Sequence, residues 1–225
     1  INFFKIAADQ GHVKSMYIYA NFFIEDEDSK CQFSISYLTN EADKGNLDAL
    51  VQVSKKMLKE EIEFNINEAL KYLKMAIEKG HLDSMCKYAH LLINEKNQVN
   101  KKEAIKYYKM TIKRGHLESM FQYGNILFNE DKEEAIKYIQ KAAEKGHLNS
   151  MCKFALLLEG GVGIAIDKKK AAEYYKNAAD NGHVDSMYYY ARMLENGEGI
   201  TINENKAAYY FNLAKATYNG HLFII

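Results

Sequence analysis

Residues 146–183 of the chain read GHLNSMCKFALLLEGGVGIAIDKKKAAEYYKNAADNGH. The segment begins and ends on a Gly-His pair. Between the pairs lie two stretches whose apolar residues recur every three or four positions, with a glycine-rich stretch separating them. This spacing places apolar side chains on one face of a helix. The segment therefore predicts two amphipathic helices, joined by a short loop and closed by a glycine.

The same unit recurs along the whole sequence. Gly-His pairs stand at Gly11, Gly80, Gly115, Gly146, Gly182 and Gly220, and Gly45-Asn46 fills the remaining place. Successive glycines are 34, 35, 35, 31, 36 and 38 residues apart. Such a period is typical of solenoids built from helix hairpins. We call the position n residues after a repeat glycine slot n.

Fixed slots carry fixed types of residue in both helices. After Gly146 the first helix has Met151, Phe154, Ala155 and Leu158 at slots 5, 8, 9 and 12, and the other repeats match them. Slot 4 holds a small residue throughout: Ser15, Ala49, Ser84, Ser119, Ser150 and Ser186. Before Gly182, the second helix has small residues 11 and 4 positions upstream and Tyr174 8 positions upstream. We expect these faces to form the core, with small residues allowing close helix packing and Tyr filling the spaces.

The glycine and the residue after it have local roles in the prediction. Glycine accepts the left-handed conformation that ends a helix. The histidine that comes next, replaced once by Asn46, is expected to act in the turn or at the start of the next helix. In four repeats a carboxylate then stands in the first turn of that helix and complements the positive end of the helix dipole. These residues are Asp48, Asp83, Glu118 and Asp185.

These residues resemble the Sel-one-like repeat, a relative of the tetratricopeptide repeat with a longer, Gly-x-Gly-containing loop. The resemblance is carried by the stretch from Ala155 to His183, with Gly161-Val-Gly163 as its loop, and by Ala191 to Ala214, with Gly197-Glu-Gly199. The loops near residues 25–29, 60–66 and 95–100 lack the Gly-x-Gly, and the connection near 129–131 is very short. The resemblance implies roles in assembling complexes, in membrane-protein quality control or in signalling.

The predicted fold is all-α, a right-handed α-solenoid of antiparallel helix hairpins over residues 1–225. We place the repeats at 11–44, 45–79, 80–114, 115–145, 146–181 and 182–219. Partial repeats at 1–10 and 220–225 follow from this division. Residues 220–225 are expected to start a new first helix, with an irregular turn at Gly220, and neither end is expected to be a true cap.

Several classes of function are disfavoured. The chain has 30 basic and 30 acidic residues, which argues against a nucleic-acid partner. It contains no apolar run long enough to cross a bilayer. Histidines in equivalent slots of a solenoid are spread apart, so we expect no metal site and no cofactor. The glycine pairs lack the lysine and strand of a phosphate-binding loop.

The cysteines suggest neither catalysis nor a disulfide framework. Cys86 and His90 stand four apart on one predicted helix, but Cys152 in the same slot has no such neighbour, so a structural role is favoured over a catalytic pair. Cys86 and Cys152 are two repeats apart and too distant to bond. We therefore expect thiols and a reducing, cytoplasmic location.

A partner surface is predicted on the first helices, away from the core face, at slots 7 and 10. Its predicted members are Gln52, Lys55, Lys87, His90, Gln122, Asn125, Lys153, Tyr189 and Arg192. Amides can grip a peptide backbone, and Lys55, Lys87, Lys153 and Arg192 would favour an acidic segment. The alternative is a merely solvated polar stripe.

The sequence favours a non-catalytic scaffold or adaptor that binds proteins or peptides. One alternative is a structural component of a large assembly, such as a cytoskeletal one. Another is a regulatory region of a longer signalling enzyme such as a kinase.

Overall fold

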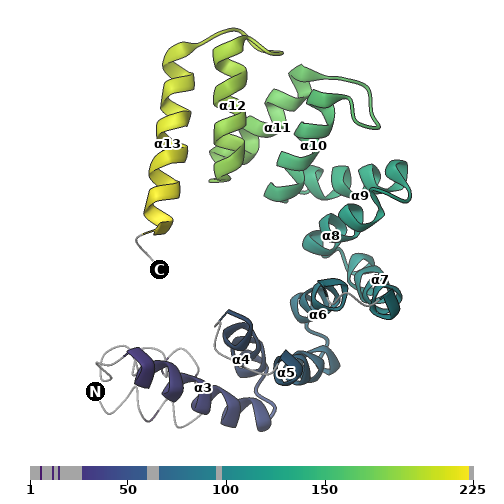
Figure 1. Ribbon diagram of the computed structural model, residues 1–225, viewed down its shortest axis with the longest axis vertical. Helices are drawn as coiled ribbons and strands as arrows, with labels where there is room; N and C mark the ends of the chain where they lie inside the picture. The colour runs from purple at the N-terminus through teal and green to yellow at the C-terminus, as the bar shows by residue number, and fades with distance from the viewer. Residues whose placement is uncertain are drawn as a thin grey trace. The chain divides into compact units, whose positions relative to one another are not determined.

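All of the regular elements that the structure describes are helices, packed as consecutive hairpins (Figure 1). The computed structural model describes Ile6, His12, Ser15 and residues 27–59, 66–94 and 98–222. The helices are α3 (Glu27–Asp43), α4 (Leu47–Lys59), α5 (Ile66–Glu78), α6 (Leu82–Asn94), α7 (Gln98–Lys113), α8 (Leu117–Leu127), α9 (Lys132–Glu144), α10 (Leu148–Gly160), α11 (Lys168–Asp180), α12 (Val184–Asn196) and α13 (Glu204–Leu222).

The chain divides into two compact units, Ile1–Tyr107 and Tyr108–Ile225, and the boundary falls inside α7. In the first unit α4 packs between α3 and α5, and α5 packs on α6. In the second unit each helix from α8 to α13 packs on the next one along the chain. The predicted all-α architecture of about six helix-hairpin repeats is thus confirmed.

Five second helices, α3, α5, α7, α9 and α11, end at their repeat glycines, as the sequence predicted. The φ angles of Gly45, Gly80, Gly115, Gly146 and Gly182 lie between 80° and 90°. At the first of these, the Gly45 N–H donates to the carbonyl of Ala42 at 2.8 Å, and the Asn46 N–H donates to that of Glu41 at 3.0 Å. This pair of bonds satisfies carbonyls at the end of α3 and closes the helix.

The residue after the glycine starts the next helix. Nδ1 of His116 accepts the backbone N–H of Ser119 at 3.2 Å, and His183 does the same for Ser186 at 3.2 Å. Asn46 performs the same task with its amide oxygen, 3.3 Å from the N–H of Ala49. The predicted helix-start role is confirmed for these three residues, because each side chain satisfies an amide that the helix leaves without a partner. His147 stands at the start of α10 without such a capping bond.

The predicted core faces are buried. Slots 5, 8, 9 and 12 of α4, α6, α8 and α12 are all buried, and Met151 of α10 is the exception at half-burial. In the second helices the small residues, such as Ala135, Ala142, Ala171 and Ala178, are fully covered. The small residues permit the close approach that helix pairs of this kind require.

The tyrosines depart from the expectation in one respect. Tyr107, Tyr138 and Tyr174, eight residues before the glycine, are only half-buried. Each makes an edge-to-face contact with the slot 8 aromatic of its own hairpin, and Tyr123 and Tyr138, for example, lie 5.0 Å apart. Tyr72, eight residues before Gly80, is fully buried as predicted, whereas in two other repeats the fully buried tyrosine is Tyr108 or Tyr175, one position later.

Each of the two Gly-x-Gly loops joins the two helices of one repeat and packs against the preceding repeat. Gly161 and Gly197 end α10 and α12 in the left-handed conformation, with φ of 65° and 71°. The second glycine of each loop lies against the start of the preceding second helix. A Cβ at Gly163 would lie 2.6 Å from Lys132 Cδ, and one at Gly199 would lie 2.5 Å from the carbonyl oxygen of Lys168. These glycines serve as packing points between hairpins, in line with the predicted loop role.

The prediction for the C-terminal residues is wrong in one respect. Helix α13 runs without a break from Glu204 to Leu222, so Gly220 does not end it and His221 does not start a new helix. The preceding pattern places the glycine slot at residue 218, where Tyr218 stands. A residue with a side chain resists the left-handed conformation, so the helix continues. The partial repeat predicted at 1–10 lies outside the described residues apart from the helical Ile6.

Candidate functional site

The predicted surface residues of the first unit stand on α4 and α6. Lys55 and His90 at slot 10 are exposed, whereas Gln52 and Lys87 at slot 7 are half-buried. The four side chains therefore avoid the fully buried core slots. Their role in binding a partner stays a prediction.

In the second unit, Gln122 belongs to a network that joins two first helices. Its Nε2 donates to Oε1 of Glu118 at 2.6 Å, and Nε2 of His147 lies 2.9 Å from Oε2 of the same carboxylate. The hydrogen bonds from His147 and Gln122 hold the pKa of Glu118 below its ordinary value, although burial opposes them. Asn125, one turn further along α8, is half-buried.

The three remaining residues of the predicted surface contact other side chains of the chain. Lys153 Nζ lies 5.3 Å above the ring of Phe128. Arg192 is paired with Glu159 and stacks 5.5 Å from the ring of Tyr189. Such contacts hold long side chains in place through charge and through the aromatic face. The positive charge of Arg192 is therefore already paired with a carboxylate of the same chain.

Glu159 connects this surface to the core. It also accepts a hydrogen bond at 3.0 Å from the hydroxyl of Tyr175, which is fully buried. Burial raises the pKa of Tyr175, and the neighbouring carboxylate raises it further, so the hydroxyl stays protonated and remains a donor. The stretch around Arg192 is consequently preorganised by three helices, α10, α11 and α12.

The histidines and cysteines have structural environments. Among the residues that the structure covers, no group of three His, Cys, Asp or Glu side chains is placed to hold a metal ion. Cys86 is buried whereas His90 is exposed. Cys152 is buried as well, and burial raises the pKa of its thiol, which reduces the thiolate that a nucleophile needs.

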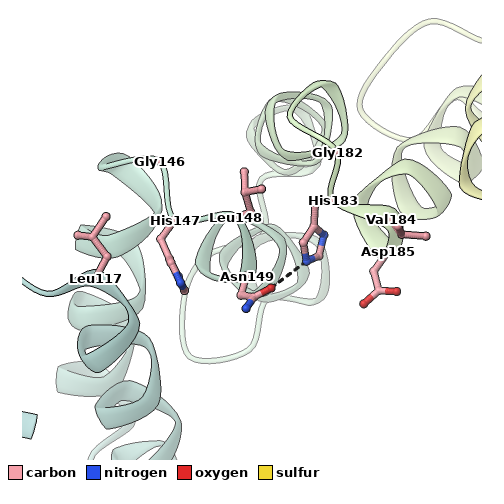
Figure 2. Close-up of a pocket in the computed structure, with 9 residues that line it drawn as sticks. All are labelled: Leu117, Gly146, His147, Leu148, Asn149, Gly182, His183, Val184 and Asp185. Atoms are coloured by element: carbon pink, nitrogen blue, oxygen red, sulfur yellow. Dashed lines mark hydrogen bonds between the residues drawn. The ribbon is translucent and has the colours of Figure 1, made fainter. Parts of the chain in front are cut away.

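A hollow of about 610 Å³ opens where the first helices of the second unit begin (Figure 2). We call it the helix-start hollow. Its lining consists of Leu117, Gly146, His147, Leu148, Asn149, Gly182, His183, Val184 and Asp185. These residues come from the starts of α8, α10 and α12 and from the glycine turns that precede the last two, so the hollow spans adjacent repeats.

Hydrogen bonds between repeats form part of its wall. Nε2 of His183 lies 3.1 Å from the amide oxygen of Asn149, as the dashed line in Figure 2 shows, while Nδ1 caps α12. The capping nitrogen accepts and the other nitrogen donates, which is the neutral form of the ring. Burial lowers the pKa of His183, and the nearby His147 lowers it further, against an opposing effect of Asp185.

The sequence interpretation missed the apolar part of this hollow. Leu117, Leu148 and Val184 all occupy slot 2, and Leu47 and Leu82 occupy it in the first unit. All five are half-buried. The recurrence of an apolar residue at slot 2 is visible in the sequence, but slot 2 lies at the edge of the helical face on which the core slots fall.

Antiparallel helix hairpins at a period near 35 residues, with a core of equivalent slots, define a tetratricopeptide-like repeat protein of the α-solenoid class. Within that class, the chain belongs to the Sel1 repeat family. The model of the Sel1 repeat matches residues 1–12, 61–81, 83–116, 118–147, 149–183 and 184–216.

Solved structures support the same fold. A Sel1 repeat protein from Oxalobacter formigenes is 24% identical, with a TM-score of 0.70 over 80% of this chain and 75% of that one. A protective antigen of uropathogenic Escherichia coli is 19% identical, with a TM-score of 0.68 over 100% of this chain and 52% of that one. An immunity protein from Pseudomonas aeruginosa is 14% identical, with a TM-score of 0.66 over 92% and 82%.

No curated protein matches the chain. None of the helices that the structure describes is both long and apolar enough to cross a membrane.

Proposed function

We propose that this chain is a non-catalytic protein-interaction module that binds segments of partner proteins on the surface of its first helices. The observation that carries the proposal is the division of labour between slots. Slots 4, 8 and 9 are buried in every described first helix and hold a narrow range of residues, whereas slots 7 and 10 are half-buried or exposed and vary from repeat to repeat.

This division is the arrangement that recognition on a solenoid needs. A constant frame fixes the positions of the variable side chains, and a row of such positions presents an extended surface to a partner. The variable slots hold Gln52, Lys87, Gln122, Lys153 and Tyr189 at slot 7. Slot 10 holds Lys55, His90, Asn125, Leu156 and Arg192.

The preorganised cluster in the second unit supports the proposal further. Tyr189 is half-buried, and Arg192 is fixed against it by Glu159. Aromatic and Arg side chains held in one geometry lose little entropy on binding, and such residues dominate interface energetics.

Position-specific photo-crosslinking in cells tests this proposal. A photoreactive amino acid is introduced at Lys55 or Asn125, on the proposed surface, and separately at Lys137 or Glu173, which are exposed on the second helices. We expect crosslinks to the same partner protein from both surface positions and weak crosslinks from the two controls. Equal crosslinking from all four positions, or crosslinking from the controls alone, would refute the proposal.

A further inference from the structure

The helix-start hollow has an apolar side and a polar side. In Figure 2 the side chains of Leu117 and Leu148 extend in one direction, while those of His147, Asn149 and Asp185 extend in the other. The two leucines and Val184 are half-buried, so part of their apolar surface remains open to a ligand. A molecule that fits the hollow must therefore be apolar along one edge and polar along the other.

The charges around the hollow favour a cationic ligand. Among the described residues that line it, none is Lys or Arg. Asp185 is exposed in the first turn of α12, and the carboxylate of Glu118 adjoins the lining through its bond to His147. The lowered pKa of His183 leaves that ring neutral at pH 7. The start of α12 could attract an anion, but His183 already occupies the N–H of Ser186.

The pairing of an apolar residue with an acidic neighbour recurs along the chain. Slots 2 and 3 hold Leu47-Asp48, Leu82-Asp83, Leu117-Glu118 and Val184-Asp185, whereas Val13-Lys14 and Leu148-Asn149 have no acidic residue. Four of the first helices therefore start with the same two chemistries in the same order. A repeated pattern of this kind suits a ligand that is itself periodic.

We propose that the helix-start hollow binds a peptide segment of a partner protein in which an apolar side chain is followed by a basic one. This inference rests on the proposed function and specifies the chemistry of the segment. Successive apolar side chains of the segment pack against the slot 2 residues of adjacent repeats, which are Leu117, Leu148 and Val184. The basic group donates hydrogen bonds to the carboxylate of Asp185. A backbone amide of the peptide can hydrogen-bond with the side chain of Asn149.

The spacing of the segment follows from that of the repeats. Neighbouring packed helices lie roughly 10 Å apart. A chain in the polyproline II conformation rises about 3.1 Å per residue and completes one turn in about three residues, so equivalent side chains three residues apart lie on the same side and match adjacent repeats. A nonapeptide with Leu, Arg and Gly repeated three times is therefore a suitable probe.

The test measures binding of fluorescein-labelled nonapeptides to the purified chain by fluorescence anisotropy. The second probe has Glu in place of each Arg, and the third has Ser in place of each Leu. We expect the Leu-Arg-Gly probe to bind at least about fivefold more tightly than either of the others. Its affinity should fall as the pH is lowered, because protonation of His183, whose pKa burial holds below its ordinary value, places a positive charge beside the basic group of the probe.

A matched pair of charge reversals locates the site. Asp185→Lys places a positive charge in the hollow, and Glu173→Lys makes the same change on α11, where Glu173 is also exposed. We expect Asp185→Lys to weaken the Leu-Arg-Gly probe at least about threefold and Glu173→Lys to leave it within about 1.5-fold. Circular dichroism serves as the check that each variant is folded.

Three results would overturn the inference. They are tight binding of the Glu probe, equal effects of the two charge reversals, and no binding of the Leu-Arg-Gly probe at millimolar concentration. Each of them leaves the photo-crosslinking result intact, so a failure of this inference is distinguishable from a failure of the proposed function.

Discussion

Replacing Gly199 by Ala should destabilise the protein more than the same change at a glycine that merely ends a helix. The new Cβ would lie 2.5 Å from the carbonyl oxygen of Lys168 and 2.7 Å from the backbone nitrogen of Lys169. Both are backbone atoms at the start of α11, so no side-chain rotation relieves the clash. The φ of Gly199 is also positive, at 72°.

The expected loss of unfolding free energy in Gly199→Ala has two parts. The left-handed conformation costs a residue with a Cβ about 1–2 kcal/mol. Overpacking against a fixed neighbour costs about 1–3 kcal/mol more. We therefore expect Gly199→Ala to lower the free energy of unfolding by about 2–5 kcal/mol.

Two other glycines supply controls. Gly182 has a φ of 90° but nothing within 4 Å of its Cβ position, so Gly182→Ala carries only the conformational cost of about 1–2 kcal/mol. Gly163→Ala should fall between the two, because the atoms closest to its Cβ belong to the flexible side chains of Lys132 and Ile136. Comparison of the three losses of unfolding free energy separates the cost of the clash between neighbouring repeats from the cost of the left-handed conformation.

Urea unfolding followed by far-UV circular dichroism measures the three losses. Hydrogen exchange by mass spectrometry then shows whether the amides at the start of α11 open first in Gly199→Ala, because solenoids can lose structure locally. Equal losses for Gly199→Ala and Gly182→Ala, or unchanged exchange at Lys170 and Ala171, whose N–H groups donate to Asp167, would refute the view that this loop is a packing point.

Three further outcomes are expected from side chains of the second unit. Tyr175→Phe removes a buried hydroxyl that donates to Glu159 and should cost about 1–2 kcal/mol of unfolding free energy in urea titrations, whereas an unchanged midpoint would show that the bond contributes nothing. Because burial lowers the pKa of His183, the unfolded chain binds a proton there more readily than the folded chain does. The free energy of unfolding should therefore fall as the pH drops through about 6.5. His183→Asn keeps a capping oxygen and should reduce this dependence between about pH 7.5 and 5.5. Cys152, buried and with a raised pKa, should react with iodoacetamide in the native protein far more slowly than in urea, as peptide mapping would show, and equal rates would contradict its burial.

The candidate site was only partly accessible to sequence reasoning. Slots 7 and 10 follow from helical periodicity, so the positions of Gln122 and Arg192 outside the core could be predicted. Their contacts could not, because Arg192 finds Glu159 on another helix and Gln122 shares Glu118 with His147 of the next repeat. The helix-start hollow was missed for the same reason, since residues of three successive repeats line it.

The sequence by itself determined the helices, their ends except that of α13, and the core slots except that of Met151. The left-handed turn at Gly146 and the capping by His183 depend on forces that act within a few residues, and periodicity alone assigns Phe154 and Leu158 to the buried face. The tertiary structure decided which side chains of different helices meet. It seats Tyr175, and not Tyr174, in the fully buried position, and it sets Gly199 against α11. Contacts of this kind depend on the distance and rotation between helices, which local sequence does not encode.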